Sequence, residues 1–230
     1  MLMEKTPKIF LNKKESERLS IFSAMIFDAS KKFNLTGLKS REAIHEILVM
    51  ESVMAFNFYR PIKNKFWSKK IVDIGAGAGI PSIPLKILNN NIKLTLIESN
   101  AKKSNFIEFV SNHLDLDVKI INDRAESIGQ DQQFRETFDI ALTRGLGRLP
   151  TVAEITLPLL KVKGTALSIK GINISKEILK SENAVTLNGG ELIGYLRATK
   201  DSSIVAWRKI SKTKSKYPRK VGTPQKNPLK

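Results

Sequence analysis

Apolar residues recur along this chain with two different periods, and the change between them divides the sequence into two parts. In residues 14–32 they recur at steps of three and four, the spacing of one buried helix face. They are Leu19, Phe22, Met25, Ile26 and Ala29. Residues 34–37 interrupt this pattern, and Ser40 is a suitable N-cap for a following helix. The pattern predicts a helical extension over residues 1–69, ending in a polar connector at 61–70.

From residue 70 onward, short apolar runs alternate with helical segments. The runs predict strands at 70–75, 93–98, 118–123, 138–143 and 164–170, with helices near 81–88, 101–113 and 150–160. Strands that are apolar nearly throughout are typical of a parallel sheet covered on both faces by crossover helices. Two later runs, 191–196 and 203–210, have no helix between them and predict an antiparallel hairpin. We therefore expect an α/β fold over residues 70–210, with a doubly wound, mostly parallel seven-stranded sheet of the Rossmann-like type.

The composition excludes several kinds of site. The chain has 230 residues and no cysteine, which excludes disulfides, thiolate zinc sites, iron–sulfur clusters and cysteine nucleophiles. Its two histidines, His45 and His113, lie on separate predicted helices, so no metal site is expected. The N-terminus has no secretory h-region, and no run of apolar residues is long enough to span a bilayer. We expect a cytoplasmic, monomeric protein with no membrane contact.

Positive charge is concentrated at the two ends of the chain. The formal net charge is +17, divided as +6 over residues 1–69, +2 over 70–207 and +9 over 208–230. A general lysine bias would also raise the charge of the central part, so a polyanion partner, most simply nucleic acid, is the better interpretation. We expect residues 211–230 to form a basic tail that binds RNA. The candidate contacts there are Lys214, Lys216, Tyr217, Arg219 and Lys220. In the competing arrangement, this segment folds back over the ligand crevice.

The first predicted strand ends in a glycine-rich turn, which is the strongest chemical signal in the sequence. Gly75, Gly77 and Gly79 follow Asp73 in a G-x-G-x-G spacing that differs from the dinucleotide spacing G-x-G-x-x-G. Such a turn lets the backbone approach a ligand closely and presents helix N-terminal N–H groups to it. Glu98 ends the second strand, where a carboxylate can accept both hydroxyls of a ribose. These features favour a nucleoside without pyrophosphate, and S-adenosylmethionine (AdoMet) fits that description.

Two further groups of residues follow strands at the same sheet edge, where ligands bind in open α/β sheets. Residues 123–126 follow the third strand, and an acidic side chain there can accept from an adenine amino group, although it can equally cap a helix. Arg144 ends the fourth strand and faces the expected crevice unless it is an ordinary surface arginine. The Asp/Asn-Pro-Pro-aromatic signature of amino methylation is missing after that strand. Transfer to an atom that is already nucleophilic, such as a purine N7, remains open and needs only alignment.

The sequence resembles the small-subunit ribosomal RNA methyltransferase G family, also called glucose-inhibited division protein B. The resemblance covers most of the chain and is carried by 34–36, 72–81, 83–85, 98–103, 124–126, 138–144, Lys170-Gly171, 217–224 and 228–229. The most specific block is the terminal Tyr-Pro-Arg-x-x-Gly-x-Pro, which begins at Tyr217. The sequence departs from the family pattern in two places. The family's His-Ile-Leu-Asp-Ser stretch is Leu-Val-Met-Glu-Ser at 48–52, and Gly145 replaces an alanine.

The resemblance implies a class I AdoMet methyltransferase fold and AdoMet-dependent methylation of guanine N7 in 16S ribosomal RNA of the small subunit. It implies that AdoMet contacts Gly75, Ile80, Ala125, Glu126 and Arg144, and it makes Arg144 and Lys170 the candidate catalytic residues. Together with the glycine turn, the expected cofactor site comprises Asp73, Gly75, Gly77, Gly79, Ile80, Glu98, Ala125, Glu126 and Arg144.

Three rival functions stay open at this point. The first is an AdoMet-dependent methyltransferase that acts on another base or another structured RNA. The second is a nicotinamide-dependent oxidoreductase, which the glycine spacing and the lack of an evident Tyr-x-x-x-Lys pair disfavour. The third is an RNA-binding protein that keeps a cofactor fold without catalysis.

Overall fold

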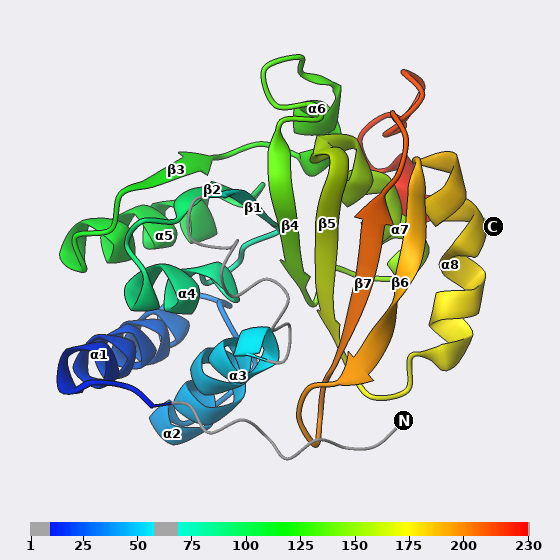
Figure 1. The fold of residues 1–230 in the computed structure, drawn as a ribbon. Coiled ribbons are helices and arrows are strands. Elements are labelled where there is room, and N and C mark those ends of the chain that lie inside the picture. The colour runs from blue at the N-terminus through cyan, green and yellow to red at the C-terminus, as the bar shows by residue number, and fades with distance from the viewer. Residues whose placement is uncertain (1–9, 58–68, 230) are drawn as a thin grey trace.

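The computed structural model of the chain describes residues 10–57 and 69–229, which form a seven-stranded sheet with helices on both faces (Figure 1). The strand order is β3-β2-β1-β4-β5-β7-β6. The strands are β1 (Lys70–Ile74), β2 (Lys93–Ile97), β3 (Val118–Ile121), β4 (Phe138–Arg144), β5 (Leu160–Lys170), β6 (Gly190–Arg197) and β7 (Ser203–Lys209). The connector predicted at 61–70 lies almost entirely outside the described residues.

The pairing of the strands confirms the mostly parallel sheet. β1 pairs in parallel with β2 and β4, β2 pairs with β3, and β4 pairs with β5. β7 lies between β5 and β6 and is antiparallel to both, so the last two strands form the predicted hairpin. Because the first five strands run the same way, the turns that follow β1, β2, β3 and β4 all lie at one edge.

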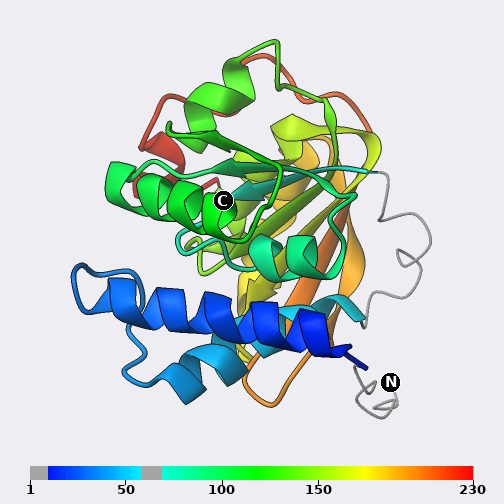
Figure 2. The ribbon, with the colours of Figure 1, turned by 90° about the vertical axis from the view of Figure 1, so that its left-hand side faces the viewer.

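The N-terminal part is helical, as predicted, and one of its helices begins at the predicted cap, Ser40. The helices are α1 (Lys13–Ser30), α2 (Arg41–Ala43), the π-helical η1 (Ile44–Met50) and α3 (Glu51–Asn57). Asn12 and Glu15 form a reciprocal capping box at the start of α1, and the Ser40 side chain accepts from the Ala43 N–H at the start of α2. Figure 2 shows α1, in blue, lying along α4 and α5.

The remaining helices connect the strands. They are α4 (Ser82–Leu88), α5 (Ala101–His113), α6 (Ala125–Gln130), α7 (Leu149–Thr156), the 3-10 turn η3 (Leu157–Leu159), α8 (Ser175–Leu187) and α9 (Thr223–Lys226). α4, α5 and α7 occupy the predicted positions. α6, α8 and α9 were not predicted, because α6 and α9 are short and the buried face of α8 includes small residues such as Ser181 and Ala184. None of the helices in the described ranges is long and apolar enough to cross a membrane.

Each face of the sheet has its own apolar core, because successive strand residues point to opposite faces. Ile71 of β1 packs with α1, η1, α4 and α5 in one core. Its neighbour Val72 packs with α6, α7 and α8 in the other. The helical extension therefore covers one face as an integral part of the fold.

A buried carboxylate ties this extension to the sheet. Glu51 at the start of α3 is only 5% exposed and forms an ion pair with Arg144 at the end of β4. Arg144 also donates to the Ile47 carbonyl at 2.8 Å and to Ser52 Oγ at 3.3 Å. The other Glu51 oxygen accepts from the Thr199 hydroxyl in the turn between β6 and β7. One carboxylate thus joins three distant segments.

The C-terminal segment, residues 211–229, is not the free tail that the charge pattern predicts. Tyr217 is 5% exposed, and the Arg135 guanidinium donates to the carbonyls of Tyr217 and Thr213, both at 2.8 Å. The Gln130 amide donates to the Pro218 carbonyl at 2.7 Å. These side-chain donors satisfy the backbone of a segment poor in apolar residues, so it folds back onto the domain, as in the competing arrangement.

Lys209, the last residue of β7, anchors the start of this segment. Its side chain is fully buried, and Nζ donates to the carbonyls of Leu157 at 2.8 Å and Asn188 at 3.0 Å and to the Thr213 hydroxyl. Burial lowers the pKa of Lys209 from 10.5 to about 8, although the carboxylate of Glu136, 3.6 Å away, opposes the shift. The folded protein therefore releases this proton more readily than the unfolded chain.

This difference predicts a pH dependence of stability. Between the folded pKa of about 8 and the unfolded value of 10.5, the unfolded chain holds the Lys209 proton and the folded chain does not, so the contribution of Lys209 to stability rises with pH. The unfolding free energy of wild type minus that of Lys209→Met should increase by about 1–3 kcal/mol from pH 8 to pH 10 in urea titrations. The control is Lys212→Met, at an exposed lysine. If the difference in unfolding free energy between wild type and variant rose equally with pH for both variants, the pH dependence could not be assigned to Lys209.

Candidate functional site

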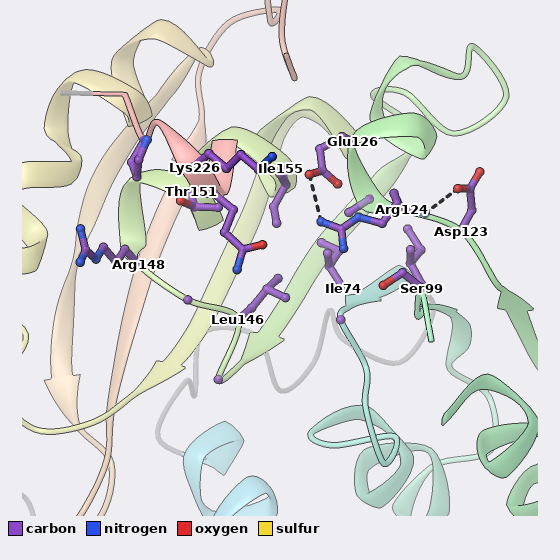
Figure 3. A pocket seen from close by; sticks show the side chains of 17 residues that line it. Ile74, Ser99, Asp123, Arg124, Glu126, Leu146, Arg148, Thr151, Ile155 and Lys226 are labelled. Carbon is purple, nitrogen blue, oxygen red and sulfur yellow. Dashed lines mark hydrogen bonds and ion pairs between the residues drawn. The ribbon is translucent and has the colours of Figure 1, made fainter. Parts of the chain in front are cut away.

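A cavity of about 610 Å³ lies at the carboxyl edge of the parallel strands (Figure 3). Its walls come from the turns after β1, β2, β3 and β4, from α7 and from the C-terminal segment. The lining residues are Ile74, Gly75, Ile97, Ser99, Asp123, Arg124, Ala125, Glu126, Gly145, Leu146, Gly147, Arg148, Thr151, Ile155, Gln225, Lys226 and Pro228. The cavity is where a doubly wound sheet is expected to bind its ligand.

The glycine turn after β1 closes tightly against β2. Gly75 N–H donates to the Ile97 carbonyl at 2.8 Å, and Gly75 and Gly77 have φ values of +67° and +58°. A Cβ at Gly75 would lie 2.3 Å from the end of the Leu146 side chain, so a larger residue would displace that side chain and would also be strained by the positive φ. A Cβ at Gly77 would meet only the Gly75 carbonyl oxygen, at 3.9 Å. The backbone at Gly77 thus borders open space, as a loop that approaches a ligand requires.

Asp73 lies beneath this turn rather than on the cavity wall. It is fully buried, and its Oδ2 accepts a 2.6 Å hydrogen bond from the Ser82 hydroxyl at the start of α4. Burial raises the pKa of Asp73 to about 7, against the hydrogen bonds from Ser82 and with a further rise from the negative charge of Glu98. Its Oδ1 has no hydrogen-bond partner within the described part of the chain. Asp73 therefore joins the turn to α4 and carries a carboxyl group that titrates near neutral pH.

Glu98 connects the first two turns. Its Oε2 accepts from the Gly77 N–H and its Oε1 from the Asn100 N–H, each at 2.8 Å. The side chain is 7% exposed, and the neighbouring Ser99, rather than Glu98, lines the cavity. The structure shows Glu98 fixing the glycine turn, while its contact with a ribose stays a prediction.

The turn after β3 contributes four consecutive residues to the wall, 123–126. Ala125 and Glu126, both predicted, therefore lie at the same cavity as Gly75. The Glu126 carboxylate is 4% exposed and accepts from Arg124 at 3.3 Å and from the Gly222 N–H at 3.0 Å. Burial alone would raise the pKa of Glu126, but these hydrogen bonds and its own backbone N–H outweigh it and hold the pKa below its ordinary value.

The two candidate catalytic residues lie behind the cavity wall. Arg144 does not line the cavity, and its guanidinium is engaged by Glu51. Lys170 donates to the carbonyl of Gly147 and to Glu177 at 3.1 Å, and the same Glu177 oxygen accepts from the Leu149 N–H at 2.8 Å. Both side chains thus hold the turn 145–149 in place. A direct catalytic role for either stays a prediction.

The five candidate RNA contacts divide into two groups. Lys214, Lys216 and Lys220 are exposed on the C-terminal segment. The structure contradicts an RNA contact for the Tyr217 ring, which is buried, and it gives the Arg219 guanidinium a partner already, the buried Glu154. Lys216 and Lys220 border a second hollow of about 520 Å³ that shares Glu126 with the first.

Several lining residues escaped the sequence analysis. Ser99 lies within the matching block 98–103, but the sequence gives it no role of its own. Four others, Leu146, Gly147, Arg148 and Thr151, lie next to predicted motifs and belong to no pattern. Gln225 and Lys226 have no local signal at all, because only the folding back of the C-terminus brings them to the cavity. Within the described ranges, no group of three or more His, Asp or Glu side chains is placed to hold a metal ion.

The residues present suit AdoMet. The ideal Cβ positions of Gly145 and Gly147 have no neighbouring atom within 4 Å, so these turns leave room for a ligand. Ser99 and Asp123 provide polar groups, and Ile74, Ile97 and Ile155 provide apolar surface for a nucleoside. Figure 3 shows Arg124 and Asp123 on one side of this space and Arg148 on the other.

Two of the solved structures with a similar fold are methyltransferases. Magnesium protoporphyrin IX methyltransferase from Synechocystis, solved with bound AdoMet, matches with a TM-score of 0.57 and 10% identity over 88% of this chain and 100% of its own. Geranyl diphosphate C-methyltransferase from Streptomyces coelicolor matches with a TM-score of 0.56 and 10% identity over 87% of this chain and 100% of its own. At these identities the likeness shows the fold alone, which is that of class I AdoMet methyltransferases.

Comparison of sequences identifies the family, whereas the structural likeness identifies only the fold. The family model for rRNA small subunit methyltransferase G matches residues 15–205. A protein of that name from Bacillus cytotoxicus is 36% identical over 227 residues, covering 96% of this chain and 93% of its own. Another from Bacillus cereus is 36% identical over 235 residues, covering 100% of this chain and 96% of its own. With the glycine turn, the cavity and these matches taken together, the chain belongs to the rRNA small subunit methyltransferase G family.

Proposed function

We propose that this protein transfers the methyl group of AdoMet to N7 of a guanine in 16S ribosomal RNA. The observation that carries the proposal is the cavity after β1 to β4 in a chain of this family, since it combines open glycine turns with polar and apolar groups for a nucleoside. Both the rRNA substrate and the guanine N7 position follow from the family, and the chemistry below is compatible with that position.

Residues from all four turns are positioned to hold the cofactor. Gly75 and the open Gly77 beside it allow close backbone approach, Ser99 and Asp123 provide polar contacts, and Ala125 and Gly145 form part of the wall. When bound there, AdoMet supplies an electrophilic methyl group on a sulfonium. We propose that a second set of residues holds these in position, namely Asp73, Gly79, Ile80, Glu98 and Glu126.

The lone pair of guanine N7 needs no general base, so the task of the chain is alignment. Arg144 and Lys170 contribute to alignment by fixing the turn 144–149. Arg144 holds its first end through the ion pair with Glu51, and Lys170 holds its last end through Glu177, which also accepts from the Leu149 N–H. The lysines 214, 216 and 220 are exposed on the C-terminal segment and suit RNA phosphates, and the last two border the second hollow.

The direct test is nucleoside analysis of RNA treated with the protein and AdoMet. Naked 16S RNA and intact small subunits from a strain lacking the enzyme serve as the two substrates. We expect N7-methylguanosine to form in at least one of them. Methylation of another base would support an AdoMet enzyme of different specificity, whereas AdoMet binding without any transfer would support a binding protein.

Gly77→Val should weaken AdoMet binding at least tenfold, about 1.4 kcal/mol. The valine side chain would occupy the open space above the turn, and the positive φ would add strain of roughly 1–2 kcal/mol. Calorimetry well below the melting temperature measures the change. Gly37→Val is the matched control, because Gly37 is exposed and its Cβ would also meet nothing within 4 Å. Unchanged affinity in a folded Gly77→Val protein would remove the turn from the cofactor site.

Replacing Lys214, Lys216 and Lys220 together by glutamine should weaken RNA binding and reduce its salt dependence. Each lost phosphate contact lowers the log–log salt slope by roughly 0.7–0.9, so the triple variant should lose about 2. AdoMet affinity should stay within twofold of wild type. The control replaces the exposed lysines 176, 180 and 200 in the same way. Equal losses in the two triple variants would mean that RNA binding follows overall charge rather than this surface.

A further inference from the structure

The C-terminal segment forms one wall of the cofactor cavity. Gln225, Lys226 and Pro228 border the same space as Gly75 and Asp123, although they lie about a hundred residues or more away in sequence. In Figure 3, Lys226 and Thr151 lie across the space from Asp123. The cavity is therefore complete only when the end of the chain is in place.

Three side chains hold this wall against the domain. Glu154 of α7 is fully buried and accepts from the Arg219 backbone N–H at 2.9 Å and from its guanidinium at 2.8 and 2.7 Å. Glu126 accepts from the Gly222 N–H at 3.0 Å. The hydroxyl of Thr151 donates to the Pro224 carbonyl at 2.8 Å.

These bonds are costly to break because they satisfy buried groups. A buried carboxylate left without its partner is strongly unfavourable, and Arg219 is the partner of Glu154. Hydrogen bonding to Glu154 raises the pKa of Arg219, so the guanidinium keeps its positive charge. The segment is thus fixed by the protein itself before any ligand arrives.

Two polar residues of this segment, Gln225 and Lys226, reach the cavity. Both are exposed, and neither side chain forms a hydrogen bond or ion pair with a described residue. The Gln225 amide can donate and accept at once, as the polar edge of a nucleoside requires. Lys226 is a cation that suits the carboxylate of an amino-acid moiety, as is Arg148 elsewhere on the cavity wall.

From these observations we propose that Gln225 and Lys226 are additional AdoMet-binding residues, and that Glu126, Thr151 and Glu154 act as positioning residues for them. The inference rests on the proposed cofactor site and extends it to the end of the chain. It also gives the C-terminal segment two surfaces with different tasks. Gln225 and Lys226 face the cofactor, whereas Lys216 and Lys220 border the second hollow.

The first test measures AdoMet affinity by calorimetry for Gln225→Ala and Lys226→Ala. Each should raise the Kd at least fivefold with little effect on melting temperature, since both side chains are exposed. Gln132→Ala and Lys212→Ala are matched controls at exposed residues outside the cavity and should stay within twofold of wild type. Wild-type affinity in both test variants would overturn the inference. An increase in the KM for RNA alone would also overturn it, by assigning these residues to the RNA.

The second test examines positioning through hydrogen exchange of the Lys226 and Asn227 amides, which donate to the carbonyls of Gly222 and Thr223. Thr151→Val removes the bond to Pro224 and should speed this exchange, and saturating AdoMet should slow it in wild type. Thr156→Val is the control, because its hydroxyl bonds only within α7, to the Val152 carbonyl. Equal exchange in the two valine variants would reject the positioning role.

The two proposals fail in different ways. If the wild-type protein binds no AdoMet, the proposed function itself is wrong. If wild type binds AdoMet while the Gln225 and Lys226 variants bind equally well and AdoMet leaves the exchange unchanged, only the assignment of the C-terminal segment is wrong.

Discussion

A buried carboxylate must be paired, and this constraint holds the separate parts of the molecule together. Four glutamates, at positions 51, 98, 126 and 154, are between 0% and 7% exposed. Each binds donors from segments far away in the sequence. Glu51 and Glu154 form buried ion pairs, for which removal of one partner costs about 3–5 kcal/mol. Glu98 and Glu126 accept backbone N–H bonds from such segments instead, and these also favour one arrangement of the segments.

The positions of these glutamates explain why the cavity is preformed. The parallel sheet brings four turns to one edge, but strand pairing alone does not fix the turns relative to one another. Glu98 fixes the first turn to the second, and Glu51 holds the end of β4 through Arg144. Glu126 and Glu154 then hold the chain end across the remaining side. A site built this way can align a methyl donor with an acceptor atom without rearranging.

Features with a local signal could be predicted from the sequence. The glycine turn, the apolar strands, α5 and the cap at Ser40 all depend on residues close together in the chain, and the structure contains each of them. The fold class followed from the same patterns. α8 was missed because much of its surface is polar and part of its buried face consists of small residues, which gives a weak periodic signal.

Contacts between side chains that are far apart in the chain leave no local pattern in the sequence. The charge pattern predicts a basic tail over residues 211–230, because nothing near Arg219 shows that its partner is Glu154, 65 positions earlier. Arg144 was correctly placed at the edge of the sheet, but its contact with Glu51 depends on how α3 packs. Gln225 and the other residues that complete the cavity can be identified only from the folded structure, because those pairs bring them there.

The central claim is that the cofactor lies between the turns after β1 to β4 and the C-terminal segment. A crystal structure of the protein with S-adenosylhomocysteine tests it most directly. The account predicts the ligand between Gly75, Asp123 and Gln225, with the Gly222 N–H still bound to Glu126 and Arg219 still bound to Glu154. A ligand bound elsewhere, or in this cavity with residues 217–229 displaced from it, would contradict the account.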